Sequence, residues 1–271
     1  MTVLHALAAA RGLAEAHGLP AAGATVLHAG SNVVVHLPPA PVVVRVMSGT
    51  AALHADPAQW LAREVSVCAH LARLGAAVVA PSDVLPAGPH HVDGLWMTGW
   101  AYVPVDRGAP EPPPDELGHA LRELHRALAR VPVEVEPLAA VADELAGLID
   151  GVNDPRAAGW RAELAAVAPR ALEVRRDAQP IHGDASLSNL LATTDGRRLW
   201  ADFEDVRCGP VEADVAGVID AARRRGLGEP YERALLAAYG PVDEELLRAQ
   251  LRLHALYGDV WRAGAGAPGR P

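Results

Sequence analysis

The stretch IHGDASLSNLL at residues 181–191 is followed closely by LWADFED at residues 199–205. Asp184 and Asn189 lie in a polar loop that leads into an apolar strand, and Asp202 ends the next apolar strand. A hairpin that turns at the Asp-Gly pair between these strands would bring Asn189 and Asp202 side by side. A carboxylate and an amide oxygen suit Mg²⁺ where phosphate supplies further ligands. Asp184 would lie near such an ion and could hydrogen-bond a substrate hydroxyl.

The pattern HGDxxxxN followed by DFE resembles the catalytic core of the aminoglycoside phosphotransferase and choline kinase-like families. These families share the protein-kinase fold, whose own loop reads HRDxxxxN followed by DFG. The segment GPVEAD at residues 209–214 also resembles the GPxxxD segment of these families. The resemblance covers nearly the whole chain and is most specific across residues 181–214.

The resemblance implies an α+β, two-lobed, protein-kinase-like fold with a small antiparallel β-sheet lobe and a larger, mainly helical lobe. We expect the nucleotide-binding lobe at residues 1–98, the hinge at 99–103, and the catalytic and acceptor-binding lobe at 104–271. The residue pattern agrees with this division. Val-rich runs bounded by Pro and Gly predict strands in the first part, and helical spacing prevails after the Pro-rich segment at 110–114.

Individual elements follow from periodicity and from the positions of Pro and Gly. Strands are predicted at residues 24–28, 33–35, 42–46, 180–181, 189–191 and 198–202. Helices are predicted at residues 2–17, 57–74, 117–128, 138–149, 156–176, 212–224, 230–238 and 243–262. His90-His91 is expected in a solvated loop, because Gly and Pro precede it. His125 is expected to pack on the leucine face of its helix and not to bind a ligand.

Composition excludes several classes of protein. The net charge is −9 and the sequence pI is about 5.7, so the chain lacks the basic character of a general nucleic-acid binder. Two cysteines, Cys68 and Cys208, make neither a disulfide framework nor a paired zinc motif. The N-terminus has no basic region typical of a signal peptide, and no stretch approaches the roughly 18 apolar residues of a membrane span. We expect a cytoplasmic protein with no nucleic-acid or membrane partner.

Four N-terminal residues and a helix residue match the nucleotide-binding elements of the family. Gly30-Ser31-Asn32 resembles the loop in which backbone amides and small side chains face phosphate. Arg45 stands where kinases have a Lys against the α- and β-phosphates, and Arg can hold phosphate through a two-pronged contact. Glu64 would pair with Arg45 and hold it in place. Taken singly, these residues are also consistent with a common turn, a surface Arg and a solvated helix-face Glu.

Residues 99–103 fall where the family crosses between its lobes. Backbone groups at this point hold the adenine edge in the family, and apolar side chains enclose the ring. Met97, Trp100 and Tyr102 would therefore line the nucleotide pocket. As isolated residues they are equally consistent with an ordinary hydrophobic core.

The resemblance implies Mg²⁺-dependent transfer of the γ-phosphate of ATP or GTP to a hydroxyl of a small molecule. Asn189 and Asp202 would hold Mg²⁺, and Arg45 would support the phosphates. Asp184 would orient the acceptor hydroxyl and take its proton in a reaction that depends on positioning and charge stabilisation. His182 is expected to steady the loop around the catalytic carboxylates. The sequence leaves both nucleotides open and carries no indication of oligomeric state.

The acceptor candidates are acidic or aromatic residues close to the motifs or in the helices that follow them. They are Glu204, Asp205, Glu212, Asp220, Asp259 and Trp261. Glu204 and Asp205 would approach either a second metal ion or a cationic substrate. The excess of carboxylates favours an aminoglycoside or another amino-bearing natural product as the acceptor. A role in antibiotic resistance is one of the functions that this acceptor class allows. The same fold accepts choline, amino acids, sugars and macrolides, so a kinase of a primary metabolite stays open.

The sequence argues against two further functions. A nucleotide-binding regulator without phosphotransfer is one, but the set of Asp184, Asn189 and Asp202 is complete, and a decayed kinase usually loses one member. A protein kinase is the other. The segment between Asp202 and the Gly-Pro element at 209–210 is short for an activation loop, and nothing resembles an APE motif.

Overall fold

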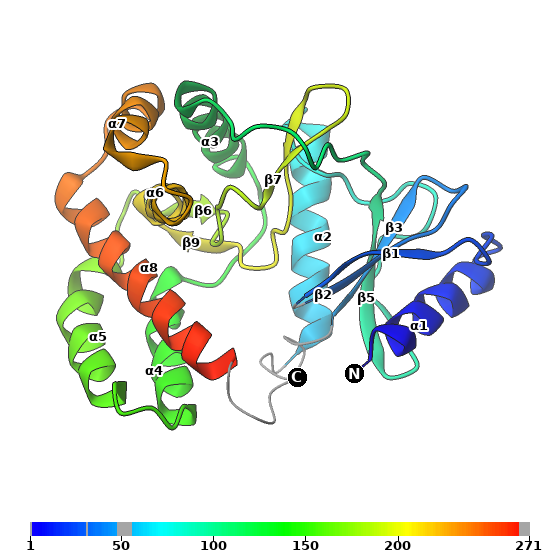
Figure 1. Cartoon of the computed structure of the whole chain (residues 1–271), viewed down its shortest axis with the longest axis horizontal. Helices are drawn as coiled ribbons and strands as arrows, with labels where there is room; N and C mark the ends of the chain where they lie inside the picture. Colours follow the sequence, from blue (N-terminus) through cyan, green and yellow to red (C-terminus); the bar gives the residue numbers. More distant parts are fainter. Residues whose placement is uncertain (1, 31, 48–55, 266–271) are drawn as a thin grey trace. The chain divides into compact units, whose positions relative to one another are not determined.

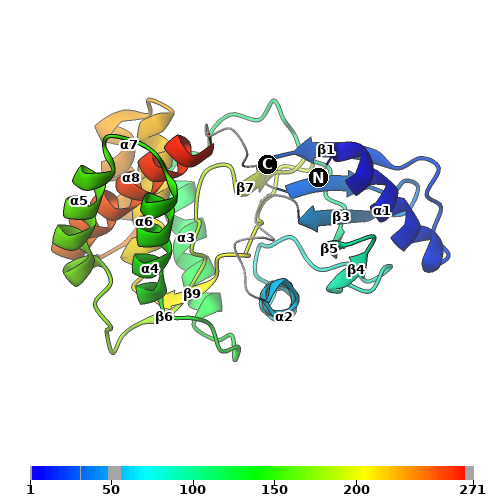
Figure 2. The same ribbon diagram turned by 90° about the horizontal axis from the view of Figure 1, so that it is seen from below.

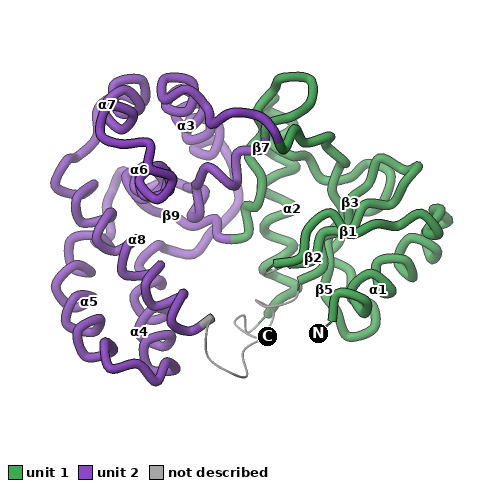
Figure 3. The backbone as a smooth tube through the Cα atoms, viewed as in Figure 1, with its two compact units in different colours: residues 1–107, 192–204, 271 green, residues 108–191, 205–270 purple. Residues whose placement is uncertain are grey.

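The computed structural model describes residues 2–30, 32–47 and 56–265, which form two compact units (Figure 3). Unit 1 comprises Met1–Arg107 with Ala192–Glu204, and unit 2 comprises Gly108–Leu191 with Asp205–Arg270. An antiparallel sheet lies in unit 1 and most of the helices lie in unit 2, which confirms the expected α+β class. The segment with the DFE motif folds with the N-terminal residues. The lobe boundaries expected at residues 98 and 104 stay predictions.

Unit 1 is built on a five-stranded antiparallel sheet with the strand order β1-β2-β3-β5-β4 (Figures 1 and 2). The strands are β1 (Thr25–Ala29), β2 (Asn32–His36), β3 (Val42–Met47), β4 (His90–Val92) and β5 (Leu95–Ala101). Two helices, α1 (Val3–Ala16) and α2 (Pro57–Arg73), complete the unit. Pro57 begins α2 at a position where its missing N–H has no intrahelical partner to lose, and Asp56 caps the helix by accepting from the backbone N–H of Gln59 at 3.1 Å.

Every residue of the central strand β3 is buried, because both of its faces are covered. Val44 and Val46 belong to the hydrophobic core that includes α1. Met47 packs on the other face with Trp60 of α2. Since side chains alternate along a strand, Arg45 lies on the α2 face. The same alternation puts neighbouring residues of β5 on opposite faces of the sheet.

The expectation of a loop at His90-His91 is wrong. Both residues belong to β4, which forms an antiparallel hairpin with β5. The turn at Asp93-Gly94 has φ values of 51° and 77°, and two positive φ values are typical of the tight turn that suits the twist of a hairpin. An Asp-Gly pair is a strong hairpin signal, but the Gly and Pro residues before the histidines obscured it. His91 is exposed and His90 is half-buried.

Unit 2 consists mainly of helices. They are α3 (Pro114–Leu128), the short 3-10 helix η2 (Leu138–Ala140), α4 (Val141–Gly151), α5 (Ala157–Ala171), α6 (Glu212–Arg224), α7 (Gly228–Tyr239) and α8 (Glu244–Ala265). Apolar residues of α4, α5 and α8 form one core. All the predicted helices of this half are present within a few residues. No helix in the described part of the chain is long and apolar enough to cross a membrane.

Short strands flank the motif loops. The polar loop is preceded by β6 (Gln179–Ile181), which pairs antiparallel with β9 (Arg207–Gly209), a strand that the sequence did not predict. The predicted hairpin after the loop is present, because β7 (Leu190–Ala192) and β8 (Arg198–Trp200) form a two-stranded sheet. Gly196 has a φ of 83° at its turn. These strands fix both ends of the motif loops to regular structure.

Helices α3 and α7 lie side by side because Gly118 of α3 has no side chain (Figure 1). A Cβ atom at this position would lie 2.5 Å from the carbonyl oxygen of Leu235 and 2.9 Å from the backbone nitrogen of Tyr239. Both of these atoms belong to the backbone of α7, so they cannot move aside as a flexible side chain would. The close approach therefore depends on glycine.

We expect Gly118→Ala to lower the free energy of unfolding by about 1–3 kcal/mol, because the added methyl group forces the two helices apart. The control is Gly147→Ala on α4, where an added Cβ has no neighbour within 4 Å. This control should gain about 0.5–1 kcal/mol from helix propensity. Urea unfolding followed by circular dichroism measures both changes. Equal stability of Gly118→Ala and the wild type would contradict the close packing of α3 on α7.

Candidate active site

Arg45 is the centre of a charged cluster in unit 1. Its Nη2 donates to Glu64 Oε2 on α2, and its Nη1 donates to Asp202 Oδ1 after β8. Glu204 Oε2 lies 3.3 Å from the same Nη1 atom. Strand β3 brings the guanidinium to the α2 face, so residues that are distant in the sequence meet on one cation. The pairing of Arg45 with Glu64 that the family pattern implies is present in the structure.

Burial and charge act on Arg45 in opposite directions. Arg45 is 9% exposed and Glu64 is 2% exposed. Burial alone would lower the pKa of Arg45, but the charges of Glu64, Asp202 and Glu204 raise it above its ordinary value. The guanidinium therefore remains charged. Three carboxylates face one cation, which leaves the cluster with an excess of negative charge.

Asn32 links the expected nucleotide loop to this cluster. It begins β2 and is buried, and its Nδ2 donates to Glu204 Oε1 at 3.4 Å and to Oε2 at 3.3 Å. Gly30 lies in a tight turn, in which a Cβ would come within 2.6 Å of His28 Nε2. Ser31 lies outside the described residues. Glu204, an acceptor candidate from the sequence, therefore lies among the residues of unit 1 that the family uses for nucleotide.

Asp202 has an unusual backbone conformation. Its φ is 67°, a left-handed value that Asp tolerates better than most residues. Its side chain is 37% exposed, in contrast to the nearly buried side chain of Glu64. Asp202 thus has room for a further partner beside Arg45.

The three predicted residues of β5 and its end lie in different environments. Met97 is fully buried in the core that includes α1, on the face of the sheet opposite to Arg45. Trp100 lies on the Arg45 face, with the guanidinium carbon 5.9 Å from its ring centroid. Tyr102 stacks on His36 with ring centroids 3.8 Å apart. Met97 and Trp100 therefore cannot line the same side of the sheet, and β5 extends to Ala101 within the expected hinge.

In unit 2 the motif loop is held through its backbone. The N–H of His182 donates to Asp214 Oδ2 at 2.7 Å, and the N–H of Gly183 donates to Asp214 Oδ1 at 2.9 Å. The N–H of Asp184 donates to His182 Nδ1 at 3.3 Å. Gly183 has a φ of 86°, and a Cβ there would lie 1.8 Å from the carbonyl oxygen of Asp205. Only glycine fits at this point of the loop.

Asp184 and Asn189 contact one another across the loop. Asn189 Nδ2 donates to the carbonyl oxygen of Asp184 at 2.8 Å and to its Oδ2 at 2.9 Å. The amide nitrogen is therefore engaged, and the amide oxygen is the atom oriented for another partner. The contact also fixes the rotamer of the Asp184 carboxylate.

Asp214, which holds the loop, is itself held by His125. His125 Nε2 lies 2.9 Å from Asp214 Oδ2, and His125 Nδ1 lies 2.8 Å from the hydroxyl of Tyr239. Burial alone would raise the pKa of Asp214, but the hydrogen bond from His125 lowers it below its ordinary value. His125 is buried, as expected from the leucine face of its helix. Its contact with Asp214 had no signal in the sequence, since 89 residues separate them.

The remaining acceptor candidates do not form one cluster among the described residues. Glu212 is buried and accepts from the backbone N–H of Asp243 at 2.9 Å. Asp220 pairs with His254 at 3.2 Å and with Arg224, and Asp259 pairs with Arg262 at 2.6 Å. Trp261 is exposed on α8. The backbone of Asp205 closely approaches Gly183 of the motif loop.

Tyr257 of α8 is a residue that the motifs did not indicate. Burial, followed by the charges of Asp205 and Glu144, raises the pKa of Tyr257 to about 12, and Asp184 adds to the effect. The charge of Arg207 acts in the opposite direction and lowers this pKa.

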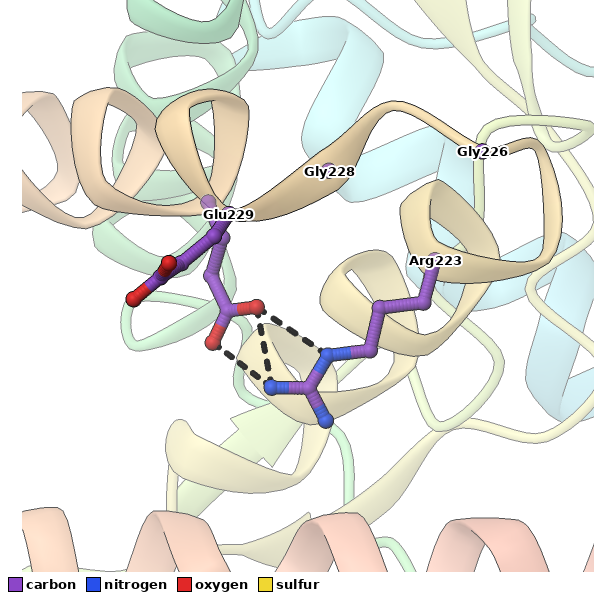
Figure 4. A pocket seen from close by; sticks show the side chains of 5 residues that line it. Arg223, Gly226, Gly228 and Glu229 are labelled. Carbon is purple, nitrogen blue, oxygen red and sulfur yellow. Dashed lines mark hydrogen bonds and ion pairs between the residues drawn. The ribbon is translucent and has the colours of Figure 1, made fainter.

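A hollow of about 490 Å³ lies elsewhere in unit 2, at the loop between α6 and α7 (Figure 4). Its lining residues are Arg223, Gly226, Gly228, Glu229 and Glu232. Arg223 and Glu232 form an ion pair with a shortest distance of 2.8 Å. None of the predicted site residues lines this hollow, so it is not the candidate active site.

Solved structures share the fold. An amicoumacin kinase in complex with AMP-PNP, Ca²⁺ and Ami aligns with a TM-score of 0.77 and 12% identity over 97% of this chain and 90% of that chain. The choline kinase LicA of Streptococcus pneumoniae aligns with a TM-score of 0.68 and 16% identity over 92% of this chain and 87% of that chain. An aminoglycoside phosphotransferase in complex with GDP and kanamycin aligns with a TM-score of 0.62 and 20% identity over 89% of this chain and 84% of that chain. The expected kinase-like fold is thereby confirmed.

The sequence comparisons define the family. No curated protein matches the chain. The model of the phosphotransferase enzyme family, in contrast, matches residues 28–254, which include the loop at Gly30, the Arg45 cluster and both motif stretches. The resemblance inferred from the HGDxxxxN and DFE motifs is confirmed by this match. The chain belongs to the phosphotransferase enzyme family.

Proposed function

We propose that this chain transfers the γ-phosphate of ATP or GTP to a hydroxyl group of an amino-bearing small molecule. The observation that carries the proposal is the double engagement of Arg45, whose terminal nitrogens contact Glu64 and Asp202. In protein kinases a strand cation, a helix glutamate and a metal-binding aspartate must all be in place for phosphoryl transfer. Residues 45, 64 and 202 are suited to these three roles.

Arg45 would bind the phosphates of the nucleotide. Its planar guanidinium can donate to two phosphate oxygens at once, which the ammonium of Lys does not do with the same geometry. Glu64 holds one end of the guanidinium and so limits its motion. The charges of Glu64, Asp202 and Glu204 outweigh burial and raise the pKa of Arg45, so the guanidinium stays positively charged at neutral pH.

Oxygen atoms of two side chains would hold Mg²⁺. Asn189 and Asp202 are the proposed ligands, since both offer oxygen atoms and Mg²⁺ prefers oxygen ligands alongside phosphate. The amide nitrogen of Asn189 is engaged by Asp184, which orients the amide oxygen as the donor. When bound, Mg²⁺ would neutralise charge on the phosphate oxygens.

Asp184 would act on the acceptor. Its carboxylate, held by Asn189, would accept a hydrogen bond from the acceptor hydroxyl and take its proton as the new P–O bond forms. The proton leaves late in a loose transition state, so an ordinary carboxylate pKa is sufficient. His182 would serve this step indirectly, because its ring receives the N–H of Asp184.

The proposed acceptor carries an amino group. The chain has a net charge of −9, and the charges of Asp205, Glu144 and Asp184 all act on Tyr257 within unit 2. The similar structures act on or bind choline, kanamycin and amicoumacin. A positively charged acceptor would be attracted to such surroundings. The role in antibiotic resistance and the cytoplasmic location expected from the sequence remain part of this proposal.

A primary-metabolite kinase is the nearest alternative, and a panel of acceptors separates the two. Aminoglycosides, other amino-bearing antibiotics, choline, amino-acid alcohols, macrolides and simple sugars would each be incubated with Mg²⁺ and ATP or GTP. Release of ADP or GDP above the acceptor-free background identifies the acceptor class. If no acceptor increases the release of ADP or GDP while nucleotide still binds, the alternative of a nucleotide-binding regulator is favoured.

Asp184→Ala should reduce kcat by about 10²–10⁴-fold, because the carboxylate that receives the proton is removed. The affinity for the Mg²⁺-nucleotide should change little. Asp83→Ala, at an exposed position of unit 1 outside both motif stretches, is the control and should leave kcat unchanged. Coupled ADP release gives kcat, and calorimetry gives the nucleotide affinity. Turnover like that of the wild type in Asp184→Ala would end the assignment of this residue.

Asp202→Ala should abolish the part of the nucleotide affinity that depends on Mg²⁺, because one proposed ligand is lost. Titration of nucleotide into the variant with Mg²⁺ and with EDTA measures this part directly. The wild type should bind more tightly with Mg²⁺, and the variant should bind equally in both conditions. A variant that still responds to Mg²⁺ as the wild type does would show that Asp202 is not a ligand.

Arg45→Lys should lower kcat/KM for the nucleotide by about 10–100-fold, the loss expected for one hydrogen bond to a charged group. Lys keeps the positive charge but cannot contact Glu64, Asp202 and phosphate through separate nitrogens. Steady-state kinetics at saturating acceptor provide the measurement. An unchanged kcat/KM would mean that charge alone is sufficient at this position.

A further inference from the structure

Three buried polar side chains from three helices form a chain of hydrogen bonds behind the motif loop. Tyr239 ends α7, His125 lies in the last turn of α3, and Asp214 lies in the first turn of α6. The Tyr239 hydroxyl is 2.8 Å from His125 Nδ1, and His125 Nε2 is 2.9 Å from Asp214 Oδ2. All of these residues belong to unit 2.

Burial makes this chain of contacts energetically important. Tyr239 is 7% exposed, His125 is 4% exposed and Asp214 is 1% exposed. A buried carboxylate remains ionised only if donors replace the water it has lost. Asp214 receives the N–H groups of His182 and Gly183 in addition to the imidazole. Removal of the imidazole would therefore disturb the same carboxylate that anchors the loop.

The tautomer of His125 is determined by its two neighbours. Asp214 is an acceptor, so His125 Nε2 must carry a proton and donate. In a neutral imidazole Nδ1 is then an acceptor, and the Tyr239 hydroxyl can donate to it. Burial raises the pKa of Tyr239, which keeps this hydroxyl protonated. The ring of Tyr239 meets that of His125 edge to face at 83°, with centroids 5.7 Å apart.

The backbone of α7 is fixed where Tyr239 leaves it. A Cβ atom on Gly118 would lie 2.9 Å from the Tyr239 backbone nitrogen, so the last turn of α7 is pressed against α3. Gly118 lies two helical turns before His125 on the same helix. The close packing of the two helices thus determines how the hydroxyl reaches the imidazole.

We propose that Tyr239 and His125 are positioning residues for phosphotransfer, which fix Asp214 and through it the loop that carries Asp184. This inference rests on the proposed function. The anchored amides of His182 and Gly183 immediately precede Asp184, so a shift of Asp214 moves the base relative to the acceptor. Small displacements of a reacting group reduce the rate strongly, whereas Arg45, the proposed contact of the nucleotide phosphates, belongs to unit 1 and lies outside this chain of contacts.

Two variants break the chain of contacts, and a third keeps only its contact with Asp214. Tyr239→Phe removes the donor to Nδ1, and His125→Leu removes both contacts. His125→Gln keeps an amide nitrogen that can donate to Asp214. The matched controls are Tyr231→Phe, on the same helix with its own hydrogen bond to the carbonyl oxygen of Pro112 at 2.6 Å, and His119→Leu on the exposed face of α3.

Three measurements are made on each full-length variant: kcat and the nucleotide KM with the acceptor found by the panel, thermal unfolding, and hydrogen–deuterium exchange of peptides that cover residues 181–189. We expect kcat to fall about 5–10-fold in Tyr239→Phe and about 100-fold in His125→Leu, with KM for nucleotide changed less than twofold. His125→Gln should recover at least tenfold over His125→Leu. The amides of residues 182 and 183 should exchange faster in Tyr239→Phe and His125→Leu and at the wild-type rate in both controls.

Loss of kcat to the same extent in Tyr231→Phe, or an unchanged kcat and exchange rate in a folded Tyr239→Phe, would overturn the proposal. If His125→Leu does not fold, Tyr239→Phe and His125→Gln still decide it. If the wild type turns over no acceptor, the proposed function fails, and the exchange rates alone then test the anchoring of the loop. Unchanged exchange at residues 182 and 183 in Tyr239→Phe would overturn the anchoring in that case as well.

Discussion

The charge of one buried carboxylate, Asp214, is the constraint on which the organisation of unit 2 depends. An isolated carboxylate in an apolar interior is unstable, so the chain must bring donors to it. It does so with the backbone amides of His182 and Gly183 and with His125 of α3. Satisfying this one group therefore attaches the motif loop and α3 to the first turn of α6. The conformation of the loop therefore depends on its hydrogen bonds to this carboxylate as well as on its own sequence.

Unit 1 has a corresponding buried group of opposite charge. Arg45 lies on a strand that is buried on both faces, and Glu64, Asp202 and Glu204 surround its guanidinium. Buried ion pairs contribute little to stability compared with apolar residues of the same size. The cluster also has more carboxylates than its cation can neutralise. Both facts favour a role in binding a charged ligand over a role in stabilising the fold.

The parts of the site that the sequence predicted are those encoded by local spacing. The loop residues Asp184 and Asn189 are five positions apart, and the hairpin after them follows from an Asp-Gly turn between apolar runs. The long amphipathic helices were predicted within a few residues for the same reason. The contact of His125 with Asp214 and Tyr239 joins three distant helices, so no local pattern could reveal it.

The sequence also did not predict the shortest strands or the faces on which strand residues lie. Strand β9 has three residues, too few for a period to appear, and β4 was obscured by neighbouring Gly and Pro. Met97 and Trp100 are both apolar and close in sequence, so the sequence alone predicts one shared environment for them. A separation of three residues puts two side chains on opposite faces of a strand, and this parity could be applied only once β5 was known to run through both.

Helix α6 shows how one regular element can organise an irregular loop. Asp214, Gly217 and Asp220 recur every three residues and therefore lie along one side of the helix. Asp214 receives two loop amides, and Gly217 leaves room for the carbonyl oxygen of Ala185, which would lie 2.6 Å from a Cβ at that position. Asp214 thus accepts from two backbone amides of the loop, and one turn later Gly217 makes room for a backbone carbonyl of the same loop. Two successive turns of α6 therefore contact the loop, and Asp214, the last residue of the GPxxxD segment, links that segment directly to the HGD loop.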